Sequence, residues 1–328
     1  MDTEKIKVLY ITGSGRSGST VLQSILGQID GFISVGELRY VWERGFYKNK
    51  LCGCGVPFQE CELWKEVLKE TSEDLAKFDP YQLYRLTESF RLHQLPFTLL
   101  PAIKNNHLSR LSGYLGTVEN LYHVVHNITG SRVIVDSSKN PAYGYLLSML
   151  PSIDMYTVHF IRDARAVAYS WSKKKLFIPD TVNPEYMPQR NPVRSALQWN
   201  ARNAAAEIWL RRPVNKYLHL RYEDFVRNPQ PSVERILNLL AEPAHELPFV
   251  SERSVQLDKN HTVFGNVVRF QTGTIDIKLD SEWRREMSSF YKTAVTYLTW
   301  PLLLKYGYVG AVRNERNTTG MKHENRMP

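Results

Sequence analysis

The sequence predicts an α/β protein built on a parallel sheet that is flanked by helices. Several short apolar runs have the length of buried strands, and each is followed by a polar loop and then by apolar residues at helical spacing. These runs cover residues 8–11, 133–135, 156–161 and 217–220. Repeated strand, loop and helix units are typical of a parallel sheet. With 328 residues and 43% hydrophobic content, residues 1–310 can form a single domain, followed by a polar, disordered tail at 311–328.

The first strand leads into a turn that is rich in glycine and hydroxyl groups. It contains Gly13, Gly15, Gly18, Ser17, Ser19, Thr20 and Arg16. Glycines accept a positive φ and let an oxyanion approach the backbone, so that successive N–H groups and the start of the next helix converge on it. The hydroxyls add donors, and the arginine adds a permanent cation. The turn therefore predicts a site for a phosphate-like anion.

Two familiar nucleotide-binding loops fit this turn in part. A Walker A loop would use Gly13, Gly18 and the hydroxyl of Thr20, but Ser19 stands where the phosphate-binding lysine belongs. Residues 13–18 also satisfy the dinucleotide pattern G-x-G-x-x-G, with an acidic residue nineteen positions later. The first fit favours a P-loop kinase and the second an NAD(P)-binding oxidoreductase, and spacing alone does not choose between them.

A third interpretation is a 5′-phosphosulfate loop. Such a loop needs one cation inside the turn, followed by Ser-Gly-Ser/Thr-Thr, and residues 16–20 supply that order. An arginine and a helix that opens with Ser-Thr suit a compact, multiply charged anion better than a pyrophosphate held by backbone alone.

The overall charge points to anionic ligands. The net charge is +9 and the isoelectric point is near 9.3, yet the basic residues are dispersed and are not interleaved with aromatics, which argues against nucleic acid. No apolar leader follows Met1, and no run approaches eighteen uninterrupted apolar residues. We therefore expect a cytoplasmic protein with no membrane span.

Further candidate residues follow the other predicted strands. Glu37 follows the apolar run 32–35, and Lys139 follows the strand at 133–135. In open α/β folds ligands bind at this edge of the sheet, so both side chains are candidates for the reaction centre. Arg162 ends the strand at 156–161, and Ser170 lies on the helix that begins within two residues of it. Together these two side chains can hold one phosphate.

Three other stretches stand out. Residues 62–127 lack strand runs and predict a helical insertion that either shapes an acceptor pocket or caps the sheet. Residues 176–195 carry no periodic signal and predict a lid loop over the acceptor site. Residues 260–271 combine a glycine-asparagine turn with Arg269 and aromatic neighbours, which is typical of a late loop that closes over a nucleotide.

The three cysteines lie close together in the sequence, at Cys52, Cys54 and Cys61. They exclude an extensive disulfide framework and leave three possibilities: one disulfide, a three-thiolate metal site, or reduced thiols in the core. A zinc site needs a fourth ligand, and no histidine stands nearby in the sequence. We favour packing thiols or a local bridge, and expect no metal site.

Taken together, the chain resembles a sulfotransferase that uses 3′-phosphoadenosine 5′-phosphosulfate (PAPS) as donor. Residues 15–20 resemble the family's 5′-phosphosulfate loop, in the arginine form of the carbohydrate and tyrosylprotein branches. Residues 160–170 resemble its 3′-phosphate motif. Further similarity to the bacterial-type branch extends over residues 6–305, with departures where Ser14-Gly15 and Ala164 replace prolines. None of these departures removes a ligand group.

This resemblance implies a P-loop-NTPase-like fold and a reaction. The sulfuryl group would pass from PAPS to a hydroxyl of a small-molecule or glycan acceptor, either a carbohydrate, a phenol or tyrosyl group, or a lipid alcohol. The implied donor ligands are Gly15, Arg16, Ser17, Gly18, Ser19, Thr20, Arg162, Ser170 and Arg269, and the implied catalytic residues are Arg16, Glu37 and Lys139. Glu37 matches the position of the family's glutamate base. Because a sulfate ester carries a single negative charge, no metal is required.

Overall fold

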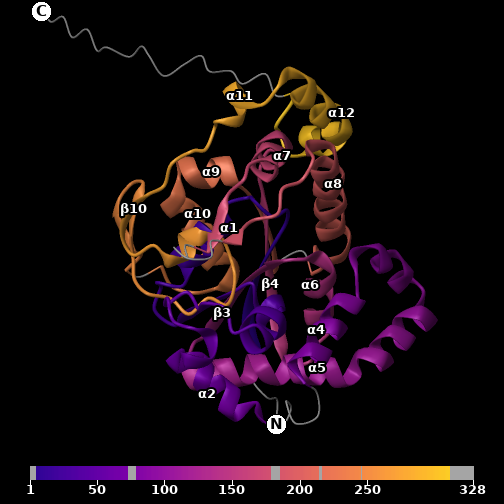
Figure 1. Ribbon diagram of the computed structural model, residues 1–328, viewed down its shortest axis with the longest axis vertical. Coiled ribbons are helices and arrows are strands. Elements are labelled where there is room, and N and C mark those ends of the chain that lie inside the picture. Colours follow the sequence, from indigo (N-terminus) through magenta and orange to yellow (C-terminus); the bar gives the residue numbers. More distant parts are fainter. Residues whose placement is uncertain (1–4, 73–78, 179–184, 214–215, 245, 311–328) are drawn as a thin grey trace, which may run out of the picture.

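The computed structural model describes residues 5–72, 79–178, 185–213, 216–244 and 246–310. A five-stranded sheet runs through its centre in the order β2-β3-β1-β4-β7, and every neighbouring pair is parallel (Figure 1). The strands are β1 (Ile6–Thr12), β2 (Phe32–Gly36), β3 (Val133–Lys139), β4 (Ile153–Ile161) and β7 (Tyr217–Arg221). The predicted α/β class and the four predicted strands are confirmed, and the apolar run at 32–35 adds β2.

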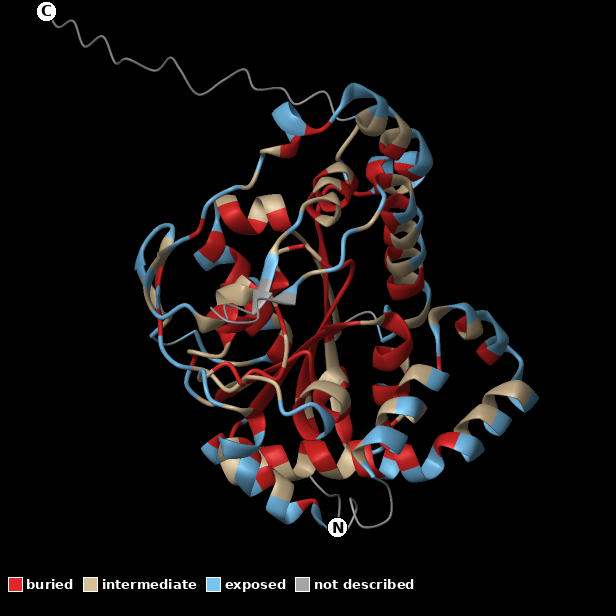
Figure 2. Cartoon of the chain, viewed as in Figure 1, coloured by how far each residue is buried: buried red, intermediate tan, exposed pale blue. Residues whose placement is uncertain are grey.

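Alternation along β1 gives the sheet two buried faces. Val8 and Tyr10 face a core shared with α2 (Glu62–Glu70), α5 (Pro101–Thr129) and α6 (Pro141–Leu147). Leu9 and Ile11 face the opposite core, which is closed by α1, α9 and α10. Successive strand residues point to opposite faces, so a fully apolar strand requires cover on both sides. Figure 2 accordingly shows the central strands largely buried, with exposed residues on the outer helices.

The remaining helices complete the layers. The helices on the second face are α1 (Ser19–Leu26), α9 (Tyr222–Arg227) and α10 (Pro229–Leu240). A third apolar cluster joins α7 (Ala164–Ser172), α8 (Pro192–Trp209), α11 (Trp283–Glu286) and α12 (Ser289–Lys305). Side-chain caps mark several helix starts: Asn140 accepts a hydrogen bond from the N–H of Ala142, and Asp163 accepts one from the N–H of Arg165.

The predicted helical insertion is present in the described part of residues 62–127. It consists of α2, α4 (Pro80–Ser89), the 3-10 helix η4 (Leu92–Leu99) and α5, and no strand occurs in these residues. The long helix α5 lies across the lower end of the molecule in Figure 1. The insertion packs on the first core cluster, and Glu88 of α4 forms an ion pair with Arg39 at 2.5 Å.

Two parts of the fold differ from the sequence prediction. Within the described part of residues 176–195, a short hairpin forms from β5 (Leu176–Ile178) and β6 (Glu185–Tyr186), and α8 begins at Pro192. An antiparallel sheet, β8 (Phe249–Ser251), β9 (Ser254–Leu257) and β10 (Gly273–Asp276), was not predicted. Its strands are too short to give a clear period of two. The predicted disordered tail at 311–328 lies outside the described residues.

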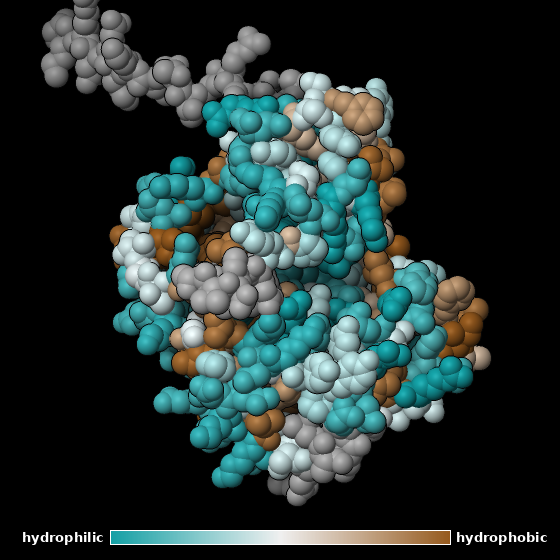
Figure 3. Space-filling model, viewed as in Figure 1, coloured by the Kyte–Doolittle hydropathy of each residue, from teal (hydrophilic) through white to brown (hydrophobic). Residues whose placement is uncertain are grey.

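Hydrophilic side chains cover most of the face shown in Figure 3, with hydrophobic ones scattered mainly toward its edges. Within the described residues, no helix is both long enough and apolar enough to cross a bilayer.

Candidate active site

The turn after β1 adopts the backbone geometry that its glycines predict. Gly13 has φ of +133°, and a Cβ there would lie 2.5 Å from the carbonyl oxygen of Phe160. Gly18 has φ of +85° and precedes the first residue of α1, and a Cβ there would lie 2.7 Å from the ring of Tyr222. Both positions exclude larger residues, so the turn can wrap around an anion at the start of α1.

Arg16 is held within this turn with its charge unsatisfied. Its φ is +70°, and its guanidinium carbon lies 4.7 Å from the ring centre of Trp171 on α7. All three guanidinium nitrogens are buried, and none has a hydrogen-bond partner among the described residues. Burial and the charge of Arg190 lower the pKa of Arg16 to about 10, against the opposing effect of Glu37. Arg16 is therefore a cation at neutral pH, positioned to bind an anion.

Glu37 and Lys139 meet at the ends of two neighbouring strands. Glu37 follows β2, Lys139 ends β3, and Lys139 Nζ donates a hydrogen bond of 2.7 Å to Glu37 Oε1. Both residues are buried, with 9% and 7% exposure. Lys139 has φ of +61°, a conformation that non-glycine residues seldom adopt and that often occurs at functional sites.

A buried network around Asp136 supports this pair. Asp136 accepts hydrogen bonds from Tyr122 Oη and from the N–H and Oγ of Ser138, and Ser138 Oγ also accepts one from the N–H of Arg39. Burial raises the pKa of Asp136 to about 6, although these hydrogen bonds oppose the rise. The network links β3 to the 3-10 helix η1 (Leu38–Tyr40) that follows Glu37.

Arg162 and Ser170 lie on the other side of β1. Arg162 Nη1 donates to the carbonyl of Arg16 at 3.1 Å, and its guanidinium carbon lies 4.5 Å from the ring centre of Tyr222. Arg162 also forms an ion pair with Asp280 at 3.0 Å. On α7, Ser170 Oγ accepts a hydrogen bond of 3.2 Å from Lys175 Nζ. Of the two predicted phosphate ligands, Arg162 thus contacts the loop residue Arg16, and Ser170 contacts a further cation, Lys175.

These groups line a single cavity of about 470 Å³. Nine of the predicted site residues line it: Gly15, Arg16, Gly18, Ser19, Thr20, Glu37, Lys139, Arg162 and Ser170. Thr20 Oγ1 also accepts a hydrogen bond from the N–H of Asn266, which joins α1 to the loop at 260–271.

Two predicted donor ligands do not line the cavity. The Oγ of Ser17 is buried and has no partner among the described residues. Arg269 corrects the prediction more clearly, because its guanidinium donates to the carbonyls of Thr262 and Leu51, at 3.0 and 2.8 Å. The loop that carries Arg269 does line the cavity, through main chain and side chains at 264–266 and 268. The loop therefore borders the cavity and Arg269 holds it in place through these carbonyls, while closure of the loop over a nucleotide stays a prediction.

Sequence reasoning missed several cationic residues of the cavity. They are Arg44, Lys175, Arg190 and Arg202. Lys175 belongs to the run of lysines at 173–175, which the sequence explains equally well as charges that stabilise the end of a helix. The three arginines occur singly, in segments without a recognisable motif. Among the described residues, the lining contains seven basic side chains and one carboxylate. This imbalance, and not any local pattern, is the signal for a highly charged anionic ligand.

The predicted helical insertion and the predicted lid differ in their relation to the cavity. None of the described residues of 62–127 lines it, so the role of the insertion in binding an acceptor stays a prediction. The segment predicted as a lid contributes Tyr186, Met187, Pro188 and Arg190. A second wall comes from Tyr40 and Phe264, whose ring centres are 4.7 Å apart.

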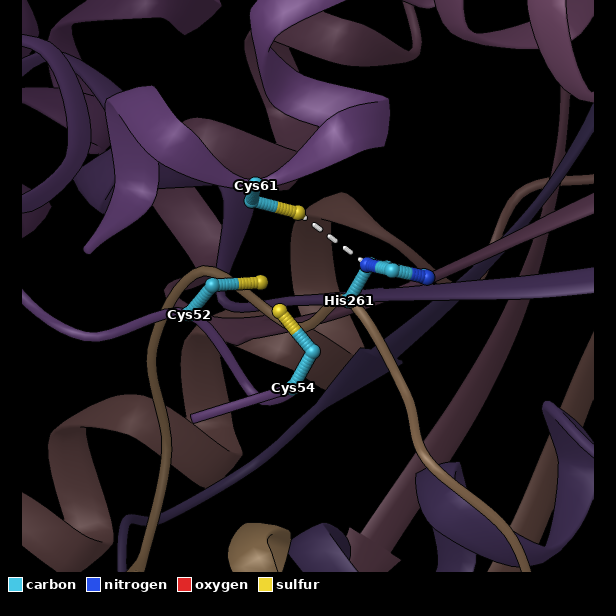
Figure 4. Close-up of side chains that lie close together, drawn as sticks. All are labelled: Cys52, Cys54, Cys61 and His261. Carbon is cyan, nitrogen blue, oxygen red and sulfur yellow. Dashed lines mark hydrogen bonds between the residues drawn. The ribbon is translucent and has the colours of Figure 1, made fainter. Parts of the chain in front are cut away.

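Outside the cavity, the fold brings a histidine to the three cysteines (Figure 4). All three thiols are free in the structure, which therefore does not contain the local disulfide that was one of the expectations. Nδ1 of His261 lies 3.1 Å from Cys61 Sγ, although 200 residues separate the two in the sequence. Hydrogen bonds from Cys52 and His261 lower the pKa of the Cys61 thiol. Sequence spacing could not reveal this histidine as a neighbour.

The fold is α/β with a parallel central sheet, and its cavity is lined by basic side chains on both sides of β1, which suits an anionic ligand. Comparison with protein families is consistent with this class, because residues 9–246 match the sulfotransferase family. The match covers most of the chain, and the protein therefore belongs to the sulfotransferase family. It is accordingly a PAPS-dependent transferase of the sulfuryl group, and family membership decides against the P-loop kinase and the NAD(P)-dependent oxidoreductase.

One solved sulfotransferase domain shows the same fold, and two further structures are less similar. The sulfotransferase domain of the Synechococcus PCC 7002 olefin synthase is 19% identical, with a TM-score of 0.51 and coverage of 92% of this chain and 96% of that one. The sulfotransferase domain from the curacin biosynthetic pathway is 17% identical, with a TM-score of 0.48 and coverage of 92% and 98%. Retinol dehydratase, in a complex with retinol and PAP, is 17% identical, with a TM-score of 0.37 and coverage of 92% and 82%. Comparison with curated protein sequences gave no significant match.

Proposed function

We propose that Glu37, Lys139 and Arg16 carry out the transfer of the sulfuryl group from PAPS to an acceptor hydroxyl. The observation that carries this proposal is the buried Glu37–Lys139 ion pair, which shares one cavity with the unsatisfied guanidinium of Arg16. A general base can remove the acceptor proton, and preorganised cations can stabilise the negative charge that develops in an in-line transfer.

In the proposed step, Glu37 removes the proton of the acceptor hydroxyl as that oxygen attacks sulfur. The new bond joins the acceptor oxygen to sulfur, while the bond from sulfur to the 5′-phosphate oxygen breaks. The leaving oxygen keeps the electron pair, and adenosine 3′,5′-bisphosphate (PAP) departs. Arg16 and the N–H groups of the loop would stabilise the charge that accumulates on the leaving phosphate. Lys139 would neutralise the sulfuryl oxygens. These cations make a metal unnecessary for the step.

Arg162 and Ser170 would hold the 3′-phosphate of the donor. A planar guanidinium binds two phosphate oxygens, and a serine hydroxyl donates to a third. Lys175, which donates to Ser170, adds a cation that sequence reasoning did not include. The carboxylate of Asp280 forms an ion pair with Arg162, so a phosphate would compete with it for the guanidinium.

We propose a small-molecule or glycan acceptor. The aromatic wall of Tyr40 and Phe264, together with Tyr186, suits the flat face of a sugar or a phenol, and Met187 adds apolar surface for a lipid alcohol. The acceptor hydroxyl must reach Glu37, which precedes Tyr40 by three residues, and both residues line the cavity.

Two measurements test this function. Titration calorimetry with PAP should give one site per chain, and the same titration with NADP⁺ should give no heat of binding. Transfer of labelled sulfate from PAPS should then be followed over carbohydrate, phenol, tyrosyl-peptide and sterol acceptors. Failure to bind PAP would overturn the donor site, whereas binding of PAP with hydrolysis only, over all four classes, would overturn the proposed acceptor chemistry.

A further inference from the structure

The cluster of Cys52, Cys54, Cys61 and His261 is separate from the donor cavity. None of the four residues lines that cavity. One potential ligand atom of each residue lies within 4.8 Å of all the others, and the sulfur atoms converge on a common centre in Figure 4. The four residues come from two segments, 52–61 and 260–271, that lie far apart in the sequence.

We propose that these four residues bind a structural zinc ion. Three thiolates and one imidazole form a common tetrahedral set for structural zinc, which leaves no open position for substrate. With Zn–S bonds of about 2.3 Å, tetrahedral sulfur atoms are about 3.8 Å apart, so side chains already within 4.8 Å reach this geometry by small rotations. Zinc would replace the thiol and imidazolium protons, which pass to solvent.

The backbone around the cluster is built to hold both segments together. The N–H of Gly53 donates to the carbonyl of Thr262 at 2.9 Å, and Nε1 of Trp64 donates to the carbonyl of His261 at 2.7 Å. A Cβ on Gly53 would lie 2.0 Å from Oδ1 of Asn260, so only glycine permits this approach. These backbone contacts therefore hold the two segments, and with them the four candidate ligands, close together.

Arg269 provides the matching charge. A site of three thiolates, one neutral imidazole and one divalent ion carries a net charge of −1. The buried guanidinium of Arg269 donates to the carbonyl of Leu51, next to the ligand Cys52, and to the carbonyl of Thr262, next to the ligand His261. This position accounts for a buried arginine that does not reach the cavity.

A zinc ion here would fix one wall of the donor cavity. The loop that contains His261 continues into Phe264, Gly265 and Asn266, which line the cavity. The N–H of Val263 donates to the carbonyl of Val35, and the N–H of Glu37 donates to the carbonyl of Phe264. The metal would thus stabilise the segment against which Glu37 is positioned, without contact with substrate.

The first experiment is elemental analysis of the full-length protein purified without chelators. We expect about one zinc per chain, and three thiols that become reactive only after the metal is removed. Cobalt(II) added to the chelated protein should give visible d–d bands and near-ultraviolet thiolate charge-transfer bands typical of a tetrahedral site. Re-addition of zinc to the chelated protein should raise the melting temperature by several degrees. These measurements require no PAPS and no acceptor, so they are independent of the proposed function.

Variants give the matched comparison. Cys61→Ser and His261→Ala should each lower the bound zinc at least tenfold, whereas His93→Ala, at an exposed histidine on η4, should leave it unchanged. If the two ligand variants fail to fold, the cobalt spectrum of the wild-type protein still decides. Absence of zinc together with the absence of a cobalt spectrum would overturn the proposal, as would a disulfide within the cluster that persists in protein purified under reducing conditions.

Discussion

Lys139 Nζ lies 2.7 Å from Glu37 Oε1, and this ion pair joins the carboxyl ends of two adjacent parallel strands inside a cavity. A buried lysine and a buried glutamate would each be unfavourable alone, and their pairing allows both to stay charged out of bulk water. In the proposed reaction, the carboxylate would face the acceptor hydroxyl and the ammonium would face the sulfuryl group.

Replacement of Glu37 by glutamine should remove the proposed base and keep the shape of the side chain. We expect kcat to fall by about 10²- to 10⁴-fold, the usual range for a general base, while PAP affinity changes little. Single-turnover kinetics together with calorimetry would separate the two effects. Near-normal turnover in the variant would exclude Glu37 as the base.

Replacement of Arg16 by glutamine should remove the cation that faces the leaving group. We expect kcat to fall by about 10²- to 10³-fold, as is typical when one stabilising donor of a transition-state charge is lost. The matched control is Arg227→Gln, which lies on α9 and does not line the cavity. An Arg16 variant that differs from the control only in donor KM would restrict this arginine to binding.

Replacement of Arg162 by alanine tests the 3′-phosphate site. We expect PAP binding to weaken by about 2 to 5 kcal/mol, the usual cost of truncating one partner of a buried charge pair. Binding of adenosine 5′-phosphosulfate, which lacks the 3′-phosphate, should change much less. Equal affinity of the wild-type protein for PAP and for AMP would contradict the assignment.

Asp280 offers a complementary test of the same site. Its carboxylate is held by Arg162, and although burial opposes this, the ion pair lowers the pKa of Asp280. Because the carboxylate competes with a phosphate for the guanidinium, Asp280→Asn should bind PAP at least as tightly as the wild-type protein. A strong loss of PAP affinity in calorimetry would show that Asp280 orients Arg162 and does not compete with the nucleotide.

His159 should make stability depend on pH. It is fully buried between Tyr217 and Asn203, and burial lowers its pKa to about 3. In the unfolded chain the imidazole binds a proton with a pKa near 6.5, whereas in the folded chain it stays neutral at that pH. The free energy of unfolding should therefore fall as the pH falls below 6.5. This contribution amounts to about 2 kcal/mol at pH 5.

Denaturant unfolding at pH 7.5 and pH 5 measures this effect. Asp136, whose pKa is raised by burial, acts in the opposite direction, because acidification lets the folded chain bind a proton there. Comparison with His159→Gln isolates the histidine, and the variant should lose less stability on acidification. The same pH dependence in both proteins would exclude His159 as its source.

The sequence was sufficient for the parts of the molecule that depend on local order. The four predicted strands, the turn at 13–20 and the pair Arg162 and Ser170 all lie within short windows whose spacing is set by one strand, one turn or one helix. Glu37 and Lys139 could also be placed at the same sheet edge, because parallel strands end on the same side. Their direct contact required the strand order, which the sequence does not contain.

The parts that were missed depend on contacts between distant segments. His261 reaches the cysteines only because the late loop crosses the segment that follows Cys52. The position of the Arg269 side chain also depends on a distant segment. Its loop borders the cavity, but the side chain donates to the carbonyls of Leu51 and Thr262 instead of reaching the cavity. Arg190 and Arg202 carry no motif, and only the folded cavity shows that they add to its charge.

The order β2-β3-β1-β4-β7 has a consequence for how such a protein can diversify. The proposed reacting pair, Glu37 and Lys139, lies at the ends of β2 and β3 on one side of β1, whereas the proposed 3′-phosphate ligands, Arg162 and Ser170, follow β4 on the other side. Changes at the β2 edge can therefore alter which alcohol is modified and leave nucleotide recognition intact. The residues that would bind the nucleotide can therefore be conserved while those near the acceptor change. A lineage could acquire new products in this way while it keeps a single donor.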